Sequence, residues 1–443
     1  MEHHQQPGTH DAAGHPASDP RTGAGTSPQP GHPGWGQQPP QAPEASATPR
    51  RLDAVDALRA LALLGIISVN VWFFTSPEAI LGEMTNPPES SADQLVRFAS
   101  TAIFEGKSYV VFSFLFGLSF VLAWASAHRQ GADVKRRAKR RSVGLIVLGV
   151  LHGFFLFMGD ILLAYGLLGL LLFAMRNTRT KTALIVAGVF YAVGATLFVG
   201  LGALSAVFDA ITVEGDADIK FTLVDPALLQ EWYSGGVLSY FGFQAIAYPL
   251  AAINIIFGQG ILAFACLLVG LVVGRERIIE RTMAGEFSTA RLLSIGLPCL
   301  LAGGAVSLIG AWLAWGPPGS AFDVGVGTHM LGQTLAVAAG PFQAAGYVIL
   351  LLLAFRSGAF DLVLRVLAPA GRMSLSNYLG QSLVLALLFS GLGFGLAGEL
   401  NAGLVGLIVV LIWLGQIIFS HLWLARFKRG PVEIPFRAWT YKA

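Results

Sequence analysis

Ten apolar stretches, each close to the length of a membrane-crossing helix, recur between residues 54 and 425. A hydrocarbon core about 30 Å thick requires about 20 apolar residues for one helical crossing, and only helices or closed barrels satisfy their backbone groups inside lipid. Charged residues make up 12% of the chain, whereas soluble domains carry about 25%. We therefore expect an all-α fold, a polytopic transmembrane helical bundle. The predicted spans are residues 54–74, 108–127, 142–158, 160–175, 182–208, 251–274, 292–315, 329–355, 373–396 and 403–425.

The charges of the connections between these stretches alternate. Basic connections occur at 128–141, 176–181, 275–291, 356–372 and after 425, and acidic or neutral ones at 75–95, 159–160, 209–235, 316–328 and 397–402. Because basic loops stay on the cytoplasmic side, this pattern predicts a multi-pass protein of a bacterial cytoplasmic membrane with both termini cytoplasmic. Residues 236–250, GVLSYFGFQAIAYPL, would break the alternation as a further span. A re-entrant or interfacial helix on the outer side is expected there.

Two segments flank the predicted transmembrane domain, residues 50–425. Residues 1–49 hold ten of the 22 prolines, and such a composition cannot bury enough apolar surface to fold. They are predicted to form a disordered cytoplasmic tail. Residues 426–443 are basic and contain Trp439 and Tyr441, which is typical of a cytoplasmic interfacial segment.

Composition and spacing also limit the partners. The basic clusters are short and border apolar spans, so the lipid bilayer is the expected partner and nucleic acid is not. Cys266 and Cys299 stand in apolar stretches, and the four histidines outside the tail lack ligand spacing, so no metal site is expected. A homodimer is compatible with the sequence.

One histidine, His152, stands in the middle of the predicted span 142–158. At about 1.5 Å per residue it lies ~16 Å from Arg141, or half of the core thickness. An ionisable group at that depth usually faces a protein interior. It is either a structural histidine, hydrogen-bonded to a neighbouring helix, or a catalytic group.

An outer layer of polar residues could complete an acid/base site with this histidine. Glu105 and Lys107 begin the second span, Asp160 stands in the tight turn at 159–160, and Asn70 is near the outer end of the first span. Tyr165 follows Asp160 in the next helix. Asp160, Glu105 and Lys107 are catalytic candidates with His152, whereas Asn70 and Tyr165 are candidates for substrate binding. Interfacial anchoring remains the alternative for the outer residues.

A second polar layer is predicted at the cytoplasmic face. Asp56 and Arg59 are spaced to pair on one helix face. The polar residues of this layer have two possible roles. They either form a structural ion pair and helix–helix hydrogen bonds, or they form an anion site that uses arginine and a helix N-terminus. The candidates are Asp56, Arg59, Arg372, Ser374, Asn377, Gln381 and Arg437.

Five segments together resemble the YeiB-like family of bacterial integral membrane proteins, which is defined by a domain of unknown function. They are RLDAVDALRALALLGIISVN, FEGKSYVVFSFLFGLSF, LHGFFLFMGDILLAYGLLG, GRMSLSNYLGQS and FKRGPVEIPFRAWTY, and the resemblance covers about residues 50–443. That family distantly resembles the transmembrane acyltransferases, such as the heparan-alpha-glucosaminide N-acetyltransferases and membrane acyltransferase family three. Those proteins move an acyl group from cytosolic acyl-CoA to an acceptor on the other side by means of an intramembrane histidine.

The resemblance implies an acyltransferase with acyl-CoA, acetyl-CoA in particular, as co-substrate and a small-molecule acceptor such as a sugar. Family three carries a histidine near the outer end of its first helix, where this chain has Asn70. His152 is then the candidate to act as general base or to carry the acyl group. A secondary transporter of a small polar metabolite remains the alternative, because ten crossings and ionisable groups at mid-depth suit it equally well.

Overall fold

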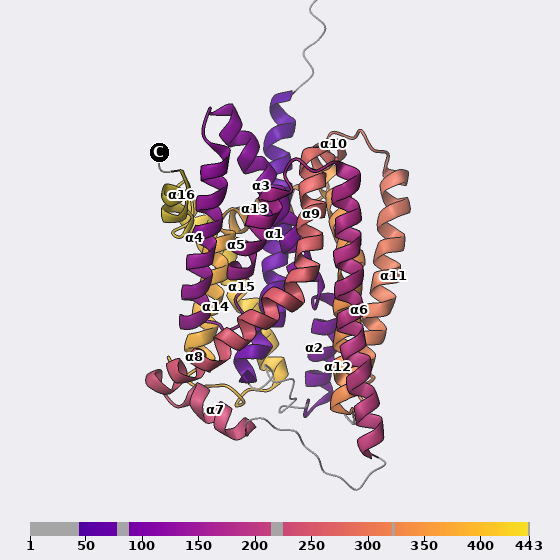
Figure 1. The fold of residues 1–443 in the computed structure, drawn as a ribbon, viewed down its shortest axis with the longest axis vertical. Helices are drawn as coiled ribbons and strands as arrows, with labels where there is room; N and C mark the ends of the chain where they lie inside the picture. The colour runs from indigo at the N-terminus through magenta and orange to yellow at the C-terminus, as the bar shows by residue number, and fades with distance from the viewer. Residues whose placement is uncertain (1–43, 78–87, 214–224, 321–323, 442–443) are drawn as a thin grey trace, which may run out of the picture. The chain divides into compact units, whose positions relative to one another are not determined.

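The computed structural model describes residues 44–77, 88–213, 225–320 and 324–441, and within these ranges the chain is helical, without strands (Figure 1). The expected all-α bundle is confirmed. The helices are α1 (Glu44–Thr75), α2 (Ser91–Ile103), α3 (Lys107–Arg129), α4 (Val134–Phe155), α5 (Leu162–Ala174), α6 (Thr180–Val213), α7 (Pro226–Ser234), α8 (Val237–Asn254), α9 (Gly260–Arg275), α10 (Ile278–Met283), α11 (Thr289–Trp315), α12 (Val326–Arg356), α13 (Asp361–Arg372), α14 (Ser374–Phe389), α15 (Ala402–Leu424) and α16 (Glu433–Tyr441).

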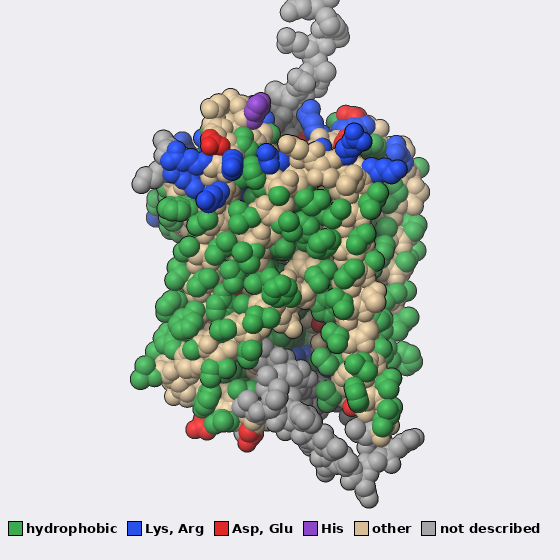
Figure 2. Space-filling model, in the orientation of Figure 1, with side chains coloured by type: hydrophobic (Ala, Val, Ile, Leu, Met, Phe, Trp, Pro, Cys, Tyr) green, Lys and Arg blue, Asp and Glu red, His purple; other side chains and the backbone are tan. Residues whose placement is uncertain are grey.

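Seven helical stretches in the described ranges are long and apolar enough to cross a membrane. They are Leu52–Thr75, Ser91–Arg129, Thr180–Ile211, Val237–Arg275, Thr289–Trp315, Val326–Arg356 and Ala402–Leu424, while Leu162–Ala174 and Ser374–Phe389 are apolar but shorter. The chain is therefore a membrane protein. On the face drawn in Figure 2, hydrophobic side chains cover a broad band, and Lys and Arg gather at one end. We call this the basic end; α10 and α16 lie there, and α7 lies at the opposite end (Figure 1).

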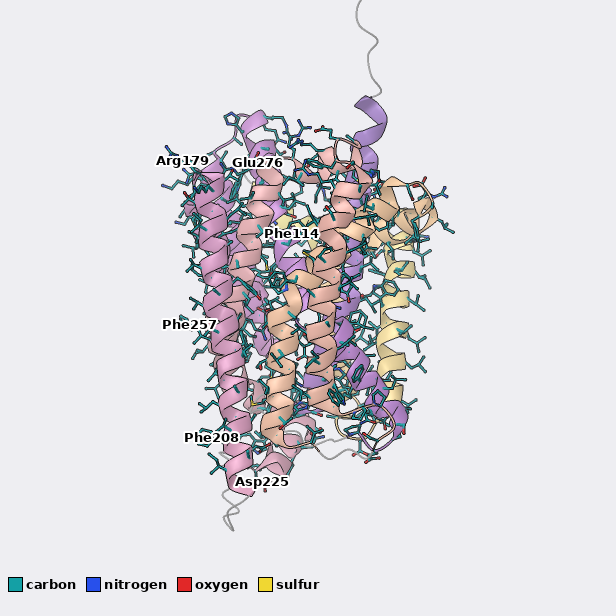
Figure 3. The ribbon with its side chains drawn as sticks, turned by 90° about the vertical axis from the view of Figure 1, so that its right-hand side faces the viewer. Phe114, Arg179, Phe208, Asp225, Phe257 and Glu276 are labelled. Atoms are coloured by element: carbon teal, nitrogen blue, oxygen red, sulfur yellow. The ribbon has the colours of Figure 1, made fainter. Side chains whose placement is uncertain are left out.

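The long helices divide into an interior set and a peripheral set. The apolar windows of α1 and of the α8–α9 stretch are 56% and 67% buried, whereas those of α6, α11 and α15 are 11%, 22% and 22% buried. Helix α6 follows the whole length of the bundle between the labelled Arg179 and Phe208 (Figure 3). Large apolar side chains on it, such as Leu184, Val189 and Leu201, are exposed, as expected of a lipid-facing helix.

The stretch 236–250, expected to be re-entrant or interfacial, is α8. It does not turn back. It continues through a π-helical turn, Ile255–Gln259, into α9, so that Val237–Arg275 forms one helical stretch of 39 residues. At about 1.5 Å per residue this stretch is far longer than a ~30 Å core, and Figure 1 shows α8 crossing the bundle obliquely before α9 rises to the basic end.

Of the two segments that flank the predicted transmembrane domain, only the C-terminal one is almost completely described. The predicted tail 1–49 lies outside the described residues except for 44–49, which form the first turns of α1. The C-terminal segment contains α16, which packs on α4 at the basic end. The indole nitrogen of Trp439 donates a 3.0 Å hydrogen bond to the carbonyl of Arg140. Gly144 permits this approach, because a β-carbon there would lie 2.9 Å from the Phe436 ring.

Candidate functional site

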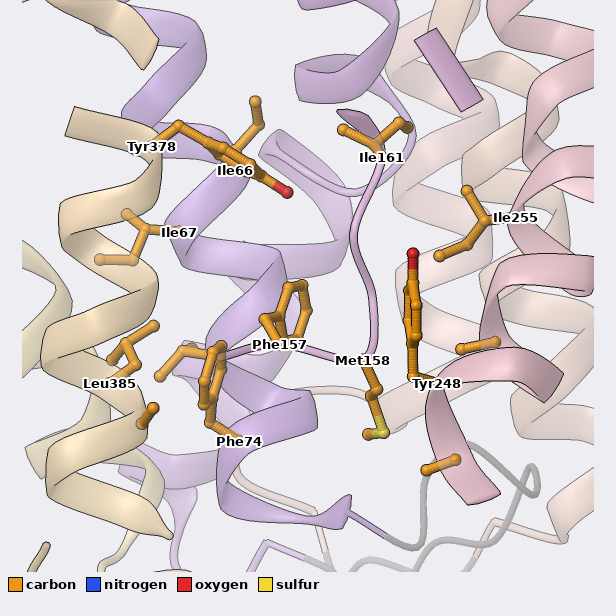
Figure 4. Close-up of a cluster of buried hydrophobic side chains, with 14 of the residues drawn as sticks. Ile66, Ile67, Phe74, Phe157, Met158, Ile161, Tyr248, Ile255, Tyr378 and Leu385 are labelled. Atoms are coloured by element: carbon orange, nitrogen blue, oxygen red, sulfur yellow. The ribbon is translucent and has the colours of Figure 1, made fainter. Parts of the chain in front are cut away.

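The connection between α4 and α5 lies inside the bundle. The sequence placed the turn at residues 159–160 on the outer surface, but Phe157, Met158 and Asp160 are each at most 3% exposed. The physical reason is the length of α5: its 13 residues rise only about 20 Å, too little to cross a ~30 Å core. Figure 4 shows Phe157, Met158 and Ile161 of this connection between α1, α14 and α8.

The buried connection forms a histidine–aspartate pair. His152, in the last turn of α4, places Nδ1 2.8 Å from Oδ1 of Asp160, and both side chains are at most 1% exposed. The other carboxylate oxygen, Oδ2, accepts a 2.9 Å hydrogen bond from the backbone N–H of Leu163 in the first turn of α5. Because an ionised carboxylate only accepts hydrogen bonds, we assign the imidazole proton to Nδ1. Nε2 then carries a lone pair and can accept a proton.

Aromatic rings pack around His152. The ring centroid of His152 lies 5.0 Å from that of Tyr378 on α14 and 6.2 Å from that of Phe157. Among the described residues Nε2 has no hydrogen-bond partner, and the Tyr378 hydroxyl has none with hydrogen-bond geometry, only a contact with the backbone amide of Ile161. The hydroxyl of Tyr378 points toward the α4–α5 connection (Figure 4).

Helix α8 closes the end of α4 with a polar stripe. Tyr240, Gln244 and Tyr248 are four residues apart and therefore share one helix face. The hydroxyl of Tyr240 donates a 3.0 Å hydrogen bond to the carbonyl of Leu156. The side-chain amide of Gln244 donates to the carbonyl of Gly153 at 3.3 Å. The hydroxyl of Tyr248 donates to the carbonyl of Gly149 at 3.2 Å. The bonds to Leu156 and Gly153 satisfy carbonyls at the end of α4 that have no partner within the helix, and the bond to Gly149 adds a contact one turn earlier. This stripe was not predicted, although its four-residue spacing is visible in the sequence.

The two candidate substrate-binding residues come from different helices. Tyr165 is fully buried in α5, and its hydroxyl lies 2.7 Å from Ser113 Oγ and 3.2 Å from the carbonyl of Tyr109. Its bonds to α3 indicate a structural contact. Asn70 is half-buried on α1, one turn beyond Ile67, which belongs to the same apolar cluster as Phe157 and Tyr378.

Glu105 and Lys107 form a separate group with α2 and α11. The carboxylate of Glu105 accepts a 2.8 Å hydrogen bond from Thr101, which in turn accepts one from the indole of Trp315 at 2.9 Å. The ammonium of Lys107 is buried and donates to the carbonyl of Thr101 at 2.9 Å. These contacts do not include His152 or Asp160, so the structure does not bring the predicted four catalytic candidates together in the described part of the chain.

The candidates predicted for the cytoplasmic face lie at the basic end. Asp56 pairs with Arg59, which also donates to Ser119 Oγ at 2.6 Å. Asn377 donates to the carbonyl of Ala370 at 2.9 Å and to Ser420 Oγ at 3.0 Å. Its amide thus holds α14 against α13 and α15, as polar residues commonly do between membrane helices.

The N-terminus of α14 is already occupied, which corrects the prediction that it binds an anionic donor. Glu433 of α16 accepts backbone hydrogen bonds from Leu375 at 2.9 Å and Ser376 at 3.0 Å, and it also bonds the Ser376 hydroxyl. The carboxylate takes the place of an external anion because both are stabilised by free N–H groups and the helix dipole. Ser374, half-buried in the same turn, is therefore not part of an open anion site.

A basic cavity of about 370 Å³ lies between α3, α4, α13 and the C-terminal segment. Two of its basic residues, Arg372 and Arg437, were predicted, and four were not. Its charged lining consists of Arg137, Arg141, Arg372, Lys428, Arg429 and Arg437, with Glu433 as the single carboxylate. Arg137 and Arg141 belong to a basic connection that indicated only the topology, so they were not predicted to be part of a site.

Comparison with known proteins decides the family. The model of a protein family of unknown function, DUF418, matches residues 273–443. The uncharacterized protein YeiB of Escherichia coli K12 is 30% identical over 400 residues, which cover 88% of this chain and 96% of YeiB. The chain belongs to the YeiB-like family. It is also similar to the uncharacterized protein YxaH of Bacillus subtilis strain 168, with 27% identity over 428 residues that cover 90% of this chain and 96% of YxaH.

The DUF418 match divides the YeiB-like site into two parts. It begins within α9 and includes α13, α14 and α16, which supply Tyr378, Arg372 and the C-terminal wall of the basic cavity. His152, Asp160 and Arg141 precede it. The site of this YeiB-like chain is thus built from both halves of the sequence.

Proposed function

We propose that this YeiB-like protein is a membrane-embedded acyltransferase that uses His152. The observation that carries the proposal is the buried pair in which Asp160 fixes Nδ1 of the imidazole and leaves Nε2 without a partner in the described residues. A carboxylate that holds a histidine in one tautomer, with the opposite nitrogen open, is the arrangement of a general base or nucleophile.

In the proposed reaction, the pair of His152 and Asp160 provides the proton transfer. An acceptor hydroxyl or amine attacks the thioester carbonyl of acyl-CoA, and Nε2 takes the proton that the acceptor loses. The bond between the acyl carbon and sulfur breaks, and the proton passes from the imidazole to the departing thiolate. If His152 carries the acyl group instead, Nε2 attacks the thioester first and expels CoA as the thiolate. The acceptor then displaces the imidazole from the acyl carbon, and the proton that the acceptor loses neutralises the thiolate. In both routes the carboxylate of Asp160 stabilises the positive charge on the ring.

The basic cavity supports binding of the donor. Six basic side chains surround about 370 Å³, and arginine suits phosphate because its planar fork makes paired hydrogen bonds. Arg141 lines this cavity, and His152 lies eleven residues further along α4, or about 16 Å at 1.5 Å per residue. An extended pantetheine arm is of comparable length, so phosphates held in the cavity would place the thioester close to His152.

The charge distribution supports an orientation. Lys and Arg gather at the end that carries α10 and α16, and basic segments stay on the cytoplasmic side of a bacterial plasma membrane. The donor would then enter from the cytosol and the acceptor from the opposite side. The described C-terminal segment would be cytoplasmic, as would the beginning of α1.

The test compares purified wild type with His152→Gln and His329→Gln in acyl transfer from acetyl-CoA to a mixture of sugars and amines. Glutamine at 152 can still donate to Asp160, whereas phenylalanine would leave a buried carboxylate unpaired. His329 is a matched control because it is also buried, but its nitrogens contact the carbonyl of Ala314 and the amide of Gln333. We expect His152→Gln to lose about 10²–10⁴-fold in rate and His329→Gln to retain it. Equal rates for wild type and His152→Gln would overturn the proposal.

A secondary transporter is the second candidate, favoured by the buried group around Thr101. Glu105 and Lys107 are two positions apart in sequence and share Thr101 as a hydrogen-bond partner, and buried ionisable groups in membrane proteins often mark ion or substrate pathways. Binding of acetyl-CoA to the purified protein separates the two candidates. Absence of binding at millimolar concentration, together with uptake of a metabolite into proteoliposomes, would favour the transporter.

A further inference from the structure

Three neighbouring side chains, one of them His152 of the histidine–aspartate pair, have buried polar atoms that lack a partner with hydrogen-bond geometry among the described residues. They are Nε2 of His152, the hydroxyl of Tyr378 and both polar atoms of the Gln381 amide. These residues are 3%, 2% and 1% exposed. Buried polar groups in native proteins almost always have a hydrogen-bond partner. Several buried polar groups without a partner in one region indicate that a molecule other than the described chain supplies their hydrogen bonds.

The three groups come from adjacent helix faces. The rings of His152 and Tyr378 are 5.0 Å apart, and Gln381 follows Tyr378 by three residues on α14, which places both on one side of the helix. Figure 4 shows α1 beside α14, with Ile67 and Phe74 facing Tyr378 and Leu385, and these four belong to one cluster. Gln381 lies between Tyr378 and Leu385 on α14.

Asn70 occupies the corresponding place on α1, between Ile67 and Phe74. Asn70 is half-buried there, on the helix that lies beside α14. Gln381 was predicted for the donor site; it lies two turns of α14 beyond Arg372 and is not among the residues that line the basic cavity.

We propose that His152, Tyr378 and Gln381, with Asn70, bind an uncharged polyhydroxylated ligand such as a sugar. This inference rests on the proposed function, in which that ligand is the acyl acceptor. A hydroxyl group can donate to Nε2 and at the same time accept from the phenol of Tyr378 or the amide of Gln381. The proton donated to Nε2 is the one that general-base catalysis removes.

The same groups select against charged ligands. Both oxygens of Asp160 are engaged, Oδ1 by His152 and Oδ2 by the N–H of Leu163, so an ammonium group would gain no free carboxylate oxygen. A carboxylate or phosphate would be repelled by the lone pair of Nε2. Burying an unpaired charge in such a site is costly, whereas neutral hydroxyls match the neutral imidazole, phenol and amide.

The test measures binding without any acyl donor, so it is independent of acyl transfer. Thermal unfolding of the full-length protein in detergent is followed with glucose, glucosamine or glucuronate, which share a ring but differ in charge. The variants are Gln381→Met and Tyr378→Phe. Tyr191→Phe is the control, because its hydroxyl has a partner in the carbonyl of Ala338 at 3.0 Å.

We expect glucose to raise the melting temperature of wild type and of Tyr191→Phe by about 1–2 °C at concentrations well above its Kd. Glucosamine and glucuronate should give smaller shifts. Gln381→Met and Tyr378→Phe should lose the glucose shift while remaining at least as stable as wild type without sugar, because apolar replacement removes a partnerless buried group.

Three results would overturn the inference. One is a glucose shift that is equal in wild type and Gln381→Met. Another is an equal or larger shift with a charged sugar. The third is no shift with any of the three, which would assign the unpaired atoms to bound water. A glucose shift in a protein that does not transfer acetyl groups would retain the site and reject the transferase.

Discussion

Gly153 lies directly against the ring of Tyr248. A β-carbon at residue 153 would come within 2.0 Å of that ring, and one at Gly149 within 2.2 Å of the backbone nitrogen of Leu163. The two glycines therefore flank His152 for a packing reason: they let α8 and the start of α5 approach α4 closely enough to hold the histidine and its aspartate.

Gly153→Ala should destabilise the protein, because the added methyl group cannot be accommodated without moving α8. Overpacking of this kind costs about 1–3 kcal/mol, so the melting temperature should fall by several degrees. Gly188→Ala is the matched control, since no atom lies within 4 Å of its β-carbon position and alanine is the better helix former. Equal melting temperatures for the two variants would contradict the packing of α8 on α4.

Asp160→Asn should abolish most activity while retaining the fold. The N–H of Leu163 can still bond the amide oxygen, but the amide nitrogen then faces Nδ1 of His152. This arrangement favours the tautomer in which Nε2 carries the proton and cannot act as a base, and we expect a loss of about 10²–10⁴-fold in acyl transfer. Asp93→Asn is the control, because Asp93 also accepts from a backbone N–H, that of Gly403 at 3.0 Å. Comparable losses in both variants would point to destabilisation rather than to the histidine tautomer.

Arg437→Gln combined with Arg429→Gln should weaken binding of CoA, because both arginines line the basic cavity. Each charge-assisted phosphate contact is worth about 1.5–3 kcal/mol, so Kd should rise at least tenfold and depend less steeply on salt. Arg291→Gln, which removes an exposed cation packed on Phe287, serves as the control. Isothermal titration with CoA and with pantetheine, which lacks the nucleotide, measures the effect. A similar Kd for all three proteins would place the phosphates elsewhere.

Glu433→Ala should loosen the first turn of α14. The substitution leaves the N–H groups of Leu375 and Ser376 without their acceptor, and loss of such a cap costs about 0.5–2 kcal/mol. Hydrogen exchange of the first turn of α14 should rise, whereas its C-terminal half should remain protected. Glu286→Ala, which removes an exposed partner of Arg281, should change neither. Unaltered exchange at Leu375 would show that α16 is not required there.

Cysteine labelling tests the orientation. In a variant without Cys266 and Cys299, a cysteine in place of Glu280 should react only with reagents applied from the cytoplasmic side, because α10 lies at the basic end. A cysteine in place of the exposed Glu399, in the α14–α15 connection, should react only from outside. The reverse pattern would invert the topology.

Apolar length predicted the helical bundle, because it is a local property of the chain. Ten spans were predicted, whereas seven helical stretches in the described ranges are long and apolar enough to cross a membrane. His152 and Asp160 were both recognised as candidates, since polar residues in apolar helices are conspicuous. Their direct contact was not foreseen, because the turn was assigned to the surface. That error came from treating residues 160–175 as a full crossing when α5 contains only 13 residues.

The site residues from distant segments were harder to predict. Tyr378 contacts His152 across 226 positions of sequence, and no local signal distinguishes it from the other apolar and aromatic residues of α14. Glu433 of α16 caps α14, which lies nearly 60 positions earlier in the sequence. Free backbone N–H groups at a helix start compete well for a carboxylate, and spacing along α16 carries no information about that competitor.

The short α5 changes the distance over which a transferred group would have to move. The α4–α5 hairpin enters from the basic end and reaches only about 20 Å into a hydrocarbon layer of ~30 Å. His152 and Asp160 therefore lie near the buried end of this hairpin, with roughly 10 Å of the layer left between them and its far side. In the proposed transferase, two reactants arriving from opposite sides would meet at one imidazole without either of them crossing the bilayer.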